Sequence, residues 1–218
     1  GKCDPESWRY KGPGCIQLLY LKEIETMSKI NERLDLLREE IQKDDFLDGK
    51  GLSNEVNIRI FCYDAAEEIT VTHFLDQLRT DPALRCRLIE CNLYKIFLSI
   101  CDDLEITDAI PEMEESEGSD FLLEQLHSAI REAEFIERIQ YEPHRRGDVL
   151  LLTGVGDVFP FMRVHSLLGA LQPHFSDIPI LVMYPGEFDG HNLELFGRLE
   201  PNDYYRAFNF FAEEDTRQ

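Results

Sequence analysis

Two short, uninterrupted apolar runs place the tightest constraint on how this chain folds. Residues 148–153 (DVLLLT) and 178–184 (IPILVMY) each have the length of one strand, and neither alternates apolar with polar residues. Strands of this kind are buried on both faces, as happens where helices cover both sides of a parallel sheet. The two runs therefore predict an α/β domain.

Strand and helix patterns alternate along the rest of the chain, and Ser119 is the expected N-cap of the fourth of five predicted helices. This order predicts a single domain over 27–218, with a mainly parallel, twisted sheet of about five strands and helices on both faces. Its topology would be Rossmann-like or P-loop-like, without the phosphate-binding Walker A motif. The further predicted strands cover 56–63, 85–93 and 205–211, and the predicted helices cover 28–43, 66–78, 94–104, 120–140 and 161–171.

The charge balance excludes one class of function. Lys and Arg number 22, Asp and Glu number 43, and the net charge is −21. Proteins that bind DNA or RNA on their own gain affinity by neutralising phosphates with basic side chains. We therefore expect no strong nucleic-acid binding by this chain alone. One basic spot, His144-Arg145-Arg146, precedes the strand predicted at 148 and should lie at the amino edge of the sheet.

The most acidic segment spans residues 102–120, which hold nine acidic side chains and no Lys or Arg. Closely spaced like charges repel one another and favour a solvated loop. Two interpretations of this acidic loop remain open. It is either a mobile linker or a recognition segment for a basic partner.

Residues 1–26 differ in composition from the rest, since they hold the only Trp and two of the six cysteines. We interpret Met27 as the natural start and residues 1–26 as a tag or upstream-translation remnant; the alternative is a genuine N-terminal extension. No apolar run of about 18 residues occurs, so we expect no membrane span.

The cysteines follow no metal-binding or disulfide spacing. Cys62 and Cys91 fall inside predicted strands, and no pair has CxxC spacing. Four clustered ligands would be needed for zinc. We therefore expect reduced, buried thiols in a cytoplasmic protein.

Acidic residues follow three of the predicted strands. Ligands of parallel sheets bind at the carboxyl ends of the strands, where Asp64, Asp157 and Glu187 are expected. If the strand order brings these carboxylates together, they could hold Mg²⁺. The alternative is that they are turn and capping residues, with Gly154 and Gly156 supplying positive φ angles.

Catalytic and cofactor motifs are incomplete in this sequence. The turn at Gly154 and Gly156 lacks the third glycine of GxGxxG, because Phe159 stands there, so we predict no cofactor. Neither HExxH nor GxSxG occurs. Aromatic residues gather near the same strand ends and could form a hot spot for a protein partner. The candidate partner-binding residues are Phe159, Phe161, Tyr184, Glu187 and Phe188.

Two longer motifs carry a family resemblance. The stretch DVLLLTGVGDVFPFMRVH over 148–165, and ILVMYPGEF over 180–188 followed by LELFG over 193–197, resemble the BrxB family of bacterial BREX phage-defence systems. The resemblance covers about residues 28–211. It implies a component of a multi-protein system that methylates host DNA and blocks phage replication, acting with the alkaline-phosphatase-like protein PglZ. It supplies no catalytic residues to carry over.

Three hypotheses follow. The first is a non-enzymatic adaptor that binds PglZ, and other BREX proteins, through the strand-end face; a homodimer also stays open. The second is a degenerate nucleotide-binding or Mg²⁺-dependent enzyme that uses Asp64, Asp157 and Glu187. The third is an electrostatic regulator, in which the acids of 102–120 contact a basic surface of a DNA-binding partner.

Overall fold

The computed structural model describes residues 29–48, 57–188, 192–197, 202–203 and 208–210. The expectations for residues 1–26 and for Met27, and most of the strand predicted over 205–211, lie outside the described residues.

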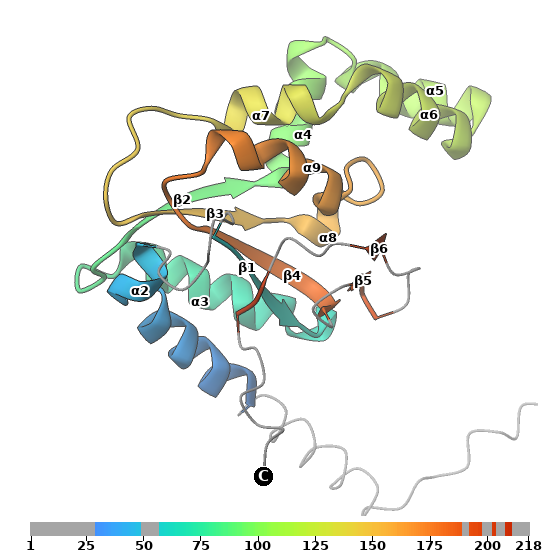
Figure 1. The fold of residues 1–218 in the computed structure, drawn as a ribbon. Helices are drawn as coiled ribbons and strands as arrows, with labels where there is room; N and C mark the ends of the chain where they lie inside the picture. The colour runs from blue at the N-terminus through green and yellow to red at the C-terminus, as the bar shows by residue number, and fades with distance from the viewer. Residues whose placement is uncertain (1–28, 49–56, 189–191, 198–201, 204–207, 211–218) are drawn as a thin grey trace, which may run out of the picture.

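A mainly parallel sheet forms the centre of the fold (Figure 1). Its strands lie in the order β2-β3-β4-β1-β7, and each neighbouring pair on this path is parallel. The predicted α/β class with about five mainly parallel strands is confirmed. The strands are β1 (Ile58–Tyr63), β2 (Arg87–Asn92), β3 (Asp148–Thr153), β4 (Ile180–Phe188) and β7 (Phe208–Asn209), with β5 (Asn192–Leu195) antiparallel to the end of β4 and β6 (Asn202–Asp203) antiparallel to β5.

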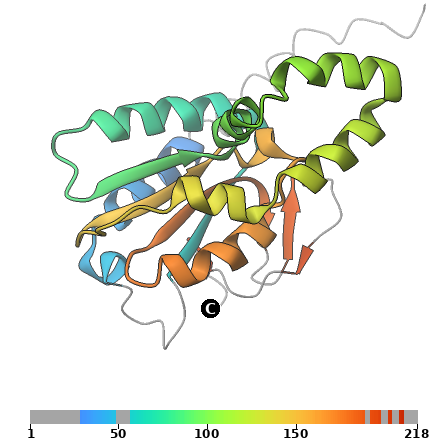
Figure 2. The same ribbon diagram turned by 90° about the horizontal axis from the view of Figure 1, so that it is seen from above.

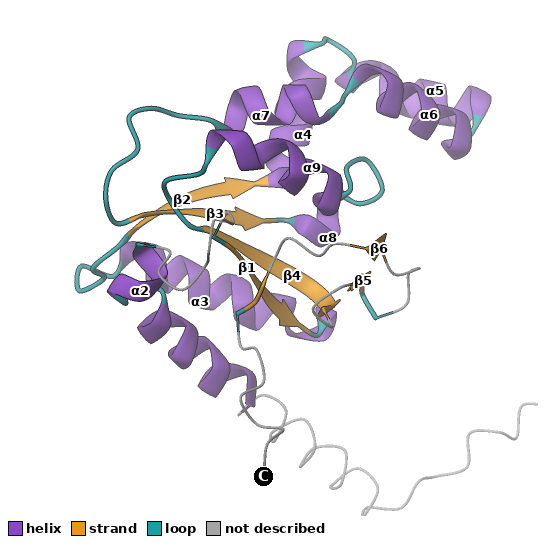
Figure 3. Ribbon diagram, in the orientation of Figure 1, coloured by secondary structure: helices purple, strands orange, loops and turns teal. Residues whose placement is uncertain are grey.

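Helices cover both faces of this sheet (Figure 3). One face carries a helix over residues 29–40, together with α2 (Asp44–Leu47) and α3 (Glu68–Thr80). The other face carries α4 (Leu93–Asp103), α7 (Glu132–Ile139), α8 (Val155–Val158) and α9 (Val164–Leu171). Three short 3₁₀ helices among the described residues span Ala65–Glu67, Thr107–Ala109 and Gln172–His174.

The burial of β3 explains why its sequence does not alternate. All six of its residues are buried. Leu150 and Leu152 belong to the core cluster under α4, α7 and α9, whereas Val149 and Leu151 belong to the cluster under α3. Because side chains of a strand point alternately to the two faces, a strand between two helical layers must be apolar on both.

The prediction of a loop over residues 102–120 is wrong. α4 extends to Asp103, a 3₁₀ helix covers Thr107–Ala109, α5 covers Ile110–Glu117, and α6 begins at Ser119. Ile110 and Met113 lie about one helical turn apart and pack partly against the core, while glutamate is a good helix former. α5 packs on α6 (Ser119–Ala129), and Figure 2 shows this helical hairpin projecting from the body of the molecule.

The long helix predicted over 120–140 is two helices, α6 and α7. The chain becomes extended at Ile130, whose side chain is buried, and α7 begins at Glu132. Ser119 is the first residue of α6 and not its N-cap; Gly118, with a φ of 91°, occupies the cap position. Left-handed backbone is a glycine conformation, so a turn rather than a serine cap separates α5 from α6.

Two further boundaries differ from the prediction. β4 continues through Phe188 instead of ending at Tyr184, because its last residues pair with β5. The turn predicted after β3 contains the short helix α8, and the helix predicted from Phe161 begins at Val164. The length of β4 depends on its pairing with β5, which lies later in the chain. The sequence pattern of β4 alone does not indicate this pairing.

Candidate functional site at the carboxyl edge of the sheet

The carboxyl ends of β2, β3, β4 and β1 meet at one edge of the sheet. The segment that follows β3 lies beside the last residues of β4 at this edge. Three glycines allow this close approach. Gly154 has a φ of 68°, and a Cβ there would lie 2.7 Å from Oδ1 of Asn92. A Cβ on Gly156 would lie 2.9 Å from the ring of Phe196, and one on Gly186 would lie 2.2 Å from the Glu194 carbonyl oxygen.

These glycines therefore serve the packing of the chain on itself. The expectation that Gly156 supplies a positive φ is wrong, since it lies inside α8, whereas the expectation for Gly154 is confirmed. α8 has four residues, so the glycine turn leads into one short helical turn. The arrangement differs from the longer helix whose N-terminus holds a phosphate in nucleotide-binding folds.

The three carboxylates predicted at this edge do not form a ligand set. Asp64 begins the 3₁₀ helix after β1, and its Oδ1 accepts a hydrogen bond from the Ala66 amide at 2.9 Å. Asp157 lies in α8 and Glu187 lies in β4, and both are exposed. Among the residues that the structure describes, no group of three or more His, Cys, Asp or Glu side chains is placed to hold a metal ion.

A pocket of about 390 Å³ opens between the ends of β1 and β4. Arg33 closes one side: its Nη2 donates a hydrogen bond to the Cys62 carbonyl oxygen at 2.6 Å, and its guanidinium lies 4.8 Å from the centre of the Phe61 ring. The Tyr63 hydroxyl donates to Glu68 at 2.7 Å. The remaining lining residues include Asp64, Gly186, Glu187, Phe188 and Phe196.

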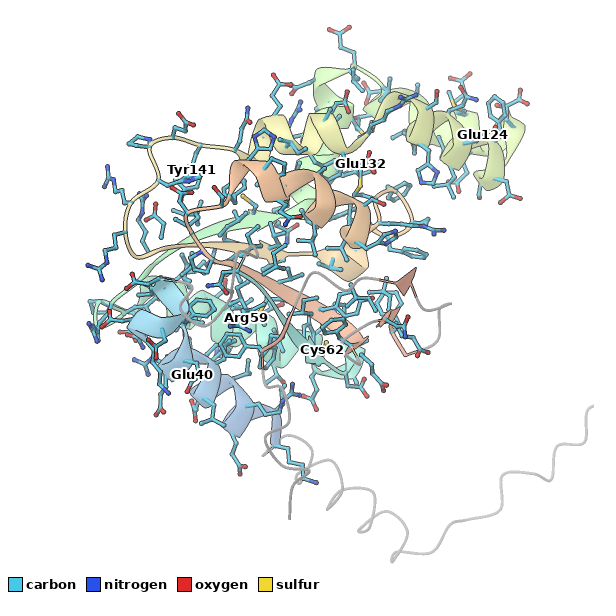
Figure 4. The ribbon with its side chains drawn as sticks, in the orientation of Figure 1. Glu40, Arg59, Cys62, Glu124, Glu132 and Tyr141 are labelled. Carbon is cyan, nitrogen blue, oxygen red and sulfur yellow. The ribbon has the colours of Figure 1, made fainter. Side chains whose placement is uncertain are left out.

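Two groups of this pocket, the Cys62 thiol and the Tyr63 hydroxyl, are held in their neutral forms. Burial raises the pKa of the Cys62 thiol to about 12, although the positive charge of Arg33 acts in the opposite direction. Burial, and then the neighbouring Glu68 carboxylate, raise the pKa of the Tyr63 hydroxyl. A thiol acts as a nucleophile only when ionised, so the pocket holds Cys62 in its unreactive form at neutral pH. Figure 4 shows Cys62 at this end of β1.

Two of the aromatic residues predicted to bind a partner are core residues. Tyr184 is 3% exposed and Phe188 is 6% exposed, and both belong to the core cluster under α4, α7 and α9. The prediction that they offer surface to a partner is therefore wrong. Their burial follows from the continuation of β4 and from the helices over that face, neither of which the aromatic spacing indicates.

Phe159 and Phe161 remain partly exposed in the loop between α8 and α9. The ring of Phe161 stacks on that of Phe97, with centroids 4.4 Å apart. Beside it lies a hollow of about 190 Å³ between this loop and α7, lined by Phe161 together with His127, Ile130, Arg131, Glu132, Met162, Arg163 and Ser166. A hydrogen bond of 2.8 Å joins a ring nitrogen of His127 to the Pro160 carbonyl oxygen.

The rim of this hollow is basic. Arg131 and Arg163 are both exposed, and neither guanidinium forms an ion pair with any of the described residues. We refer to Phe159, Phe161, Arg131 and Arg163 together as the α8–α9 surface. Aromatic and arginine side chains are the residue types enriched where proteins bind one another.

The opposite, amino edge holds a polar network that the sequence analysis missed. Asp148 is 1% exposed, and its carboxylate accepts hydrogen bonds from Arg87, from the Tyr141 hydroxyl at 2.8 Å and from the Arg145 amide at 3.0 Å. Arg87 is the main reason that the pKa of Asp148 falls to about 2. The sequence signal for this network was Asp148 itself, an acidic residue at the first position of an otherwise apolar strand. Tyr141 is labelled in Figure 4.

The basic spot at residues 144–146 lies at this amino edge, as predicted. His144 contacts Asp177 through Nδ1 at 2.6 Å, and Arg146 pairs with Asp48 at 3.2 Å. The spot therefore joins neighbouring segments of the chain.

Comparison with known proteins decides the family. A model described as "BREX protein BrxB" matches residues 89–210. A Bacillus cereus (strain H3081.97) protein named "BREX protein BrxB" is 36% identical over 189 residues, covering 84% of this chain and 97% of its own length. This chain belongs to the BrxB family.

A second BrxB relative, from Escherichia coli O9:H4 (strain HS), is 29% identical over 186 residues, covering 83% of this chain and 91% of its own length. No solved structure gives a significant match. The BrxB resemblance noted from the sequence is confirmed, and the chain is a component of a BREX antiviral defence system. Within the described residues, no helix has the length and apolar character needed to cross a bilayer.

Proposed function

We propose that this BrxB protein is a non-enzymatic adaptor of its BREX system. In this proposal it acts in the cytoplasm, binds the phosphatase-like protein PglZ and contacts other BREX proteins. Through these contacts it supports phage restriction and host DNA methylation. Membership of the BrxB family supports the system, and the resemblance drawn from the sequence motifs supplies PglZ as the partner.

The α8–α9 surface is the observation that carries the proposal. It combines two partly exposed phenylalanines with two arginines that have no ion-pair partner in the described part of the chain. Exposed basic groups of this kind match an acidic patch on a partner. Phe161 rests on Phe97, so its ring is already ordered before a partner binds.

The state of the other candidate groups supports a role without chemistry. The Asp64 carboxylate caps a 3₁₀ helix. Burial raises the pKa of the Cys91 thiol to about 11, with the neighbouring Glu90 acting in the same direction, and burial raises the pKa of Cys86 to about 11. Catalysis by a cysteine nucleophile needs a thiol that ionises near neutral pH.

Affinity measurements on single variants test the surface. We expect Phe159→Ala and Arg163→Glu each to weaken binding of PglZ by about tenfold or more, as hot-spot residues do. Phe121→Ala is the matched control, because Phe121 is a 41% exposed phenylalanine on the α5–α6 hairpin. If all three variants bind PglZ as the parent protein does, the α8–α9 surface is not the interface.

A further inference from the structure

Among the described residues, the backbone groups on the outer edge of β2 have no hydrogen-bond partner. Arg87 donates its amide to the Gly147 carbonyl oxygen at 2.8 Å, so the peptide groups of Arg87, Ile89 and Cys91 face β3. Those of Leu88 and Glu90 must then face away from β3. Within the described residues β2 pairs with β3 alone, and no backbone hydrogen bond joins Leu88 or Glu90 to another segment.

The register of β3 gives the same answer independently. The Leu150 amide donates to the Pro179 carbonyl oxygen at 3.0 Å. The backbone N–H and C=O groups of Leu150 therefore face β4. The backbone groups of its neighbours Val149 and Leu151 face β2, where they bond to the backbone groups of Arg87, Ile89 and Cys91. The alternation across β3 leaves Leu88 and Glu90 pointing outward.

Open strand edges attract other strands, and proteins usually block them with proline, a bulge or an outward charge. β2 contains no proline, and its register with β3 is unbroken over six residue pairs. Its one acidic side chain, Glu90, does not guard the edge, because it pairs with Arg79 of α3 and accepts a hydrogen bond from Thr153 at 2.9 Å. The edge is therefore available for pairing.

A groove of about 450 Å³ runs beside this edge, between the end of β2 and the flank of α4. Its charged residues are Glu90, Lys95 and Arg138. Arg138 pairs with Asp103, and Glu90 pairs with Arg79. Lys95 is exposed and has no ion-pair partner among the described residues, so the groove presents one unmatched positive charge.

We propose that β2 is a docking edge for an extended segment of a partner protein. The segment adds as a strand beside Leu88 and Glu90 and places an acidic side chain against Lys95. Main-chain hydrogen bonds supply the affinity of such strand addition, and the flanking side chains supply the specificity. This surface is separate from the α8–α9 surface. Its occupant is an extended, acidic segment of another BREX protein.

A partner strand fits this edge better than a second copy of the chain. Antiparallel pairing of two β2 edges would join outward residues to outward residues, and the symmetric register centred on Glu90 sets two glutamates opposite each other. It would also bring together two chains of net charge −21 each. A partner segment with an acidic side chain instead complements Lys95.

Residue-resolved hydrogen exchange tests the edge on the intact protein. The probe is the native BREX assembly, purified through this chain after expression of its whole operon. In the isolated chain we expect the Leu88 and Glu90 amides to exchange fast, and the Ile89 and Cys91 amides to exchange slowly because they bond to β3. In the assembly the two outward amides should slow by about tenfold or more.

A pair of substitutions isolates the backbone donor. Glu90→Ala and Glu90→Pro both remove the contacts to Arg79 and Thr153, but only the proline removes the outward amide. We expect Glu90→Pro to bind its partner about tenfold more weakly than Glu90→Ala. Lys95→Glu should weaken binding more than Lys95→Gln, and this second pair keeps the test open if Glu90→Pro does not fold.

Three results would overturn the inference. One is slow exchange of the Leu88 and Glu90 amides in the isolated chain, which would mean that the chain itself or a second copy covers the edge. Another is fast exchange of these two amides in the assembly, or equal binding of the partner by the two variants of each pair. Either result would leave the proposed adaptor function intact. The third is the failure of any BREX protein to bind, which would remove the proposed function as well.

Discussion

The Asp148 carboxylate accepts two hydrogen bonds from the Arg87 guanidinium, at 2.7 and 2.6 Å, and these bonds join the first residues of β3 and β2. The two residues are 61 positions apart in the chain and opposite each other in the sheet. The pair fixes the register of the edge strand at its amino end. A two-bond guanidinium–carboxylate contact has a defined geometry that a single ion pair lacks.

We predict that this pair makes stability depend on pH in the acid range. The folded-state pKa of Asp148 is about 2, below that of an unfolded aspartate, so its contribution is fully present above about pH 4 and is lost as the pH falls toward 2. We expect about 1–2 kcal/mol, since Arg87 is partly exposed to water. Denaturant unfolding of Asp148→Asn and the parent protein at pH 7 and pH 3 measures it.

The two proteins should differ clearly in stability at pH 7, and by about half as much at pH 3, which lies between the folded and unfolded pKa values of Asp148. Tyr141→Phe, which removes only the hydroxyl that donates to Asp148, should cost about 1 kcal/mol at pH 7. An Asp148→Asn variant as stable as the parent at pH 7 would contradict the account of this network.

We predict that Gly186→Ala destabilises the protein by more than about 2 kcal/mol. Its Cβ would lie 2.2 Å from the Glu194 carbonyl oxygen, so the β4–β5 pair would have to separate. Gly169→Ala is the control, because that glycine lies in α9 with nothing within 4 Å of an added Cβ. The control should be stabilised by about 0.5–1 kcal/mol. Equal effects at the two positions would show that β5 does not pack as described.

The acidic segment should behave as a packed helical hairpin. Leu126 of α6 is 4% exposed, whereas Glu124 on the same helix is exposed (Figure 4). Leu126→Ala should therefore lower the free energy of unfolding by about 2–4 kcal/mol, and Glu124→Ala should change it by less than about 0.5 kcal/mol. Thermal unfolding of both variants checks this. No loss of stability in Leu126→Ala would show that α6 does not pack as described.

We predict that Cys62 reacts slowly with iodoacetamide at pH 8. With a pKa of about 12, almost none of the thiol is ionised, and alkylation should be at least about a hundredfold slower than for the same residue in urea-unfolded protein. Peptide mass spectrometry after timed labelling gives both rates. Rapid labelling in the folded protein would show that the pocket ionises its thiol, and it would reopen the hypothesis of nucleophilic chemistry there.

The sequence predicts the parts of this fold that depend on local pattern. The apolar runs of β3 and β4 identify buried strands, and parallel order then places Asp64, Asp157 and Glu187 at the carboxyl edge. Contacts between distant residues decide the rest. The acidic residue at the start of β3 indicates a polar contact, but no local pattern identifies Arg87 as its partner, or β5 as the partner of the end of β4.

The prediction that Tyr184 and Phe188 are exposed to a partner fails for the same reason. Tyr184 and Phe188 lie four residues apart on the same side of β4, and the helices over that face place them in the core. The acidic segment fails differently: its charges indicate repulsion, but the apolar positions Ile110 and Met113, together with Leu122 and Leu126, anchor the hairpin. Charge alone does not prevent a helix that buries one side.

Size-exclusion chromatography with light scattering tests the central claim most directly. This chain and the PglZ protein of the same BREX system would be measured alone and mixed, at about 150 mM salt, so that exposed charges more than a Debye length apart are largely screened. The adaptor account predicts one stable shared peak whose mass gives the stoichiometry. Two separate peaks at the masses of the individual proteins would contradict it.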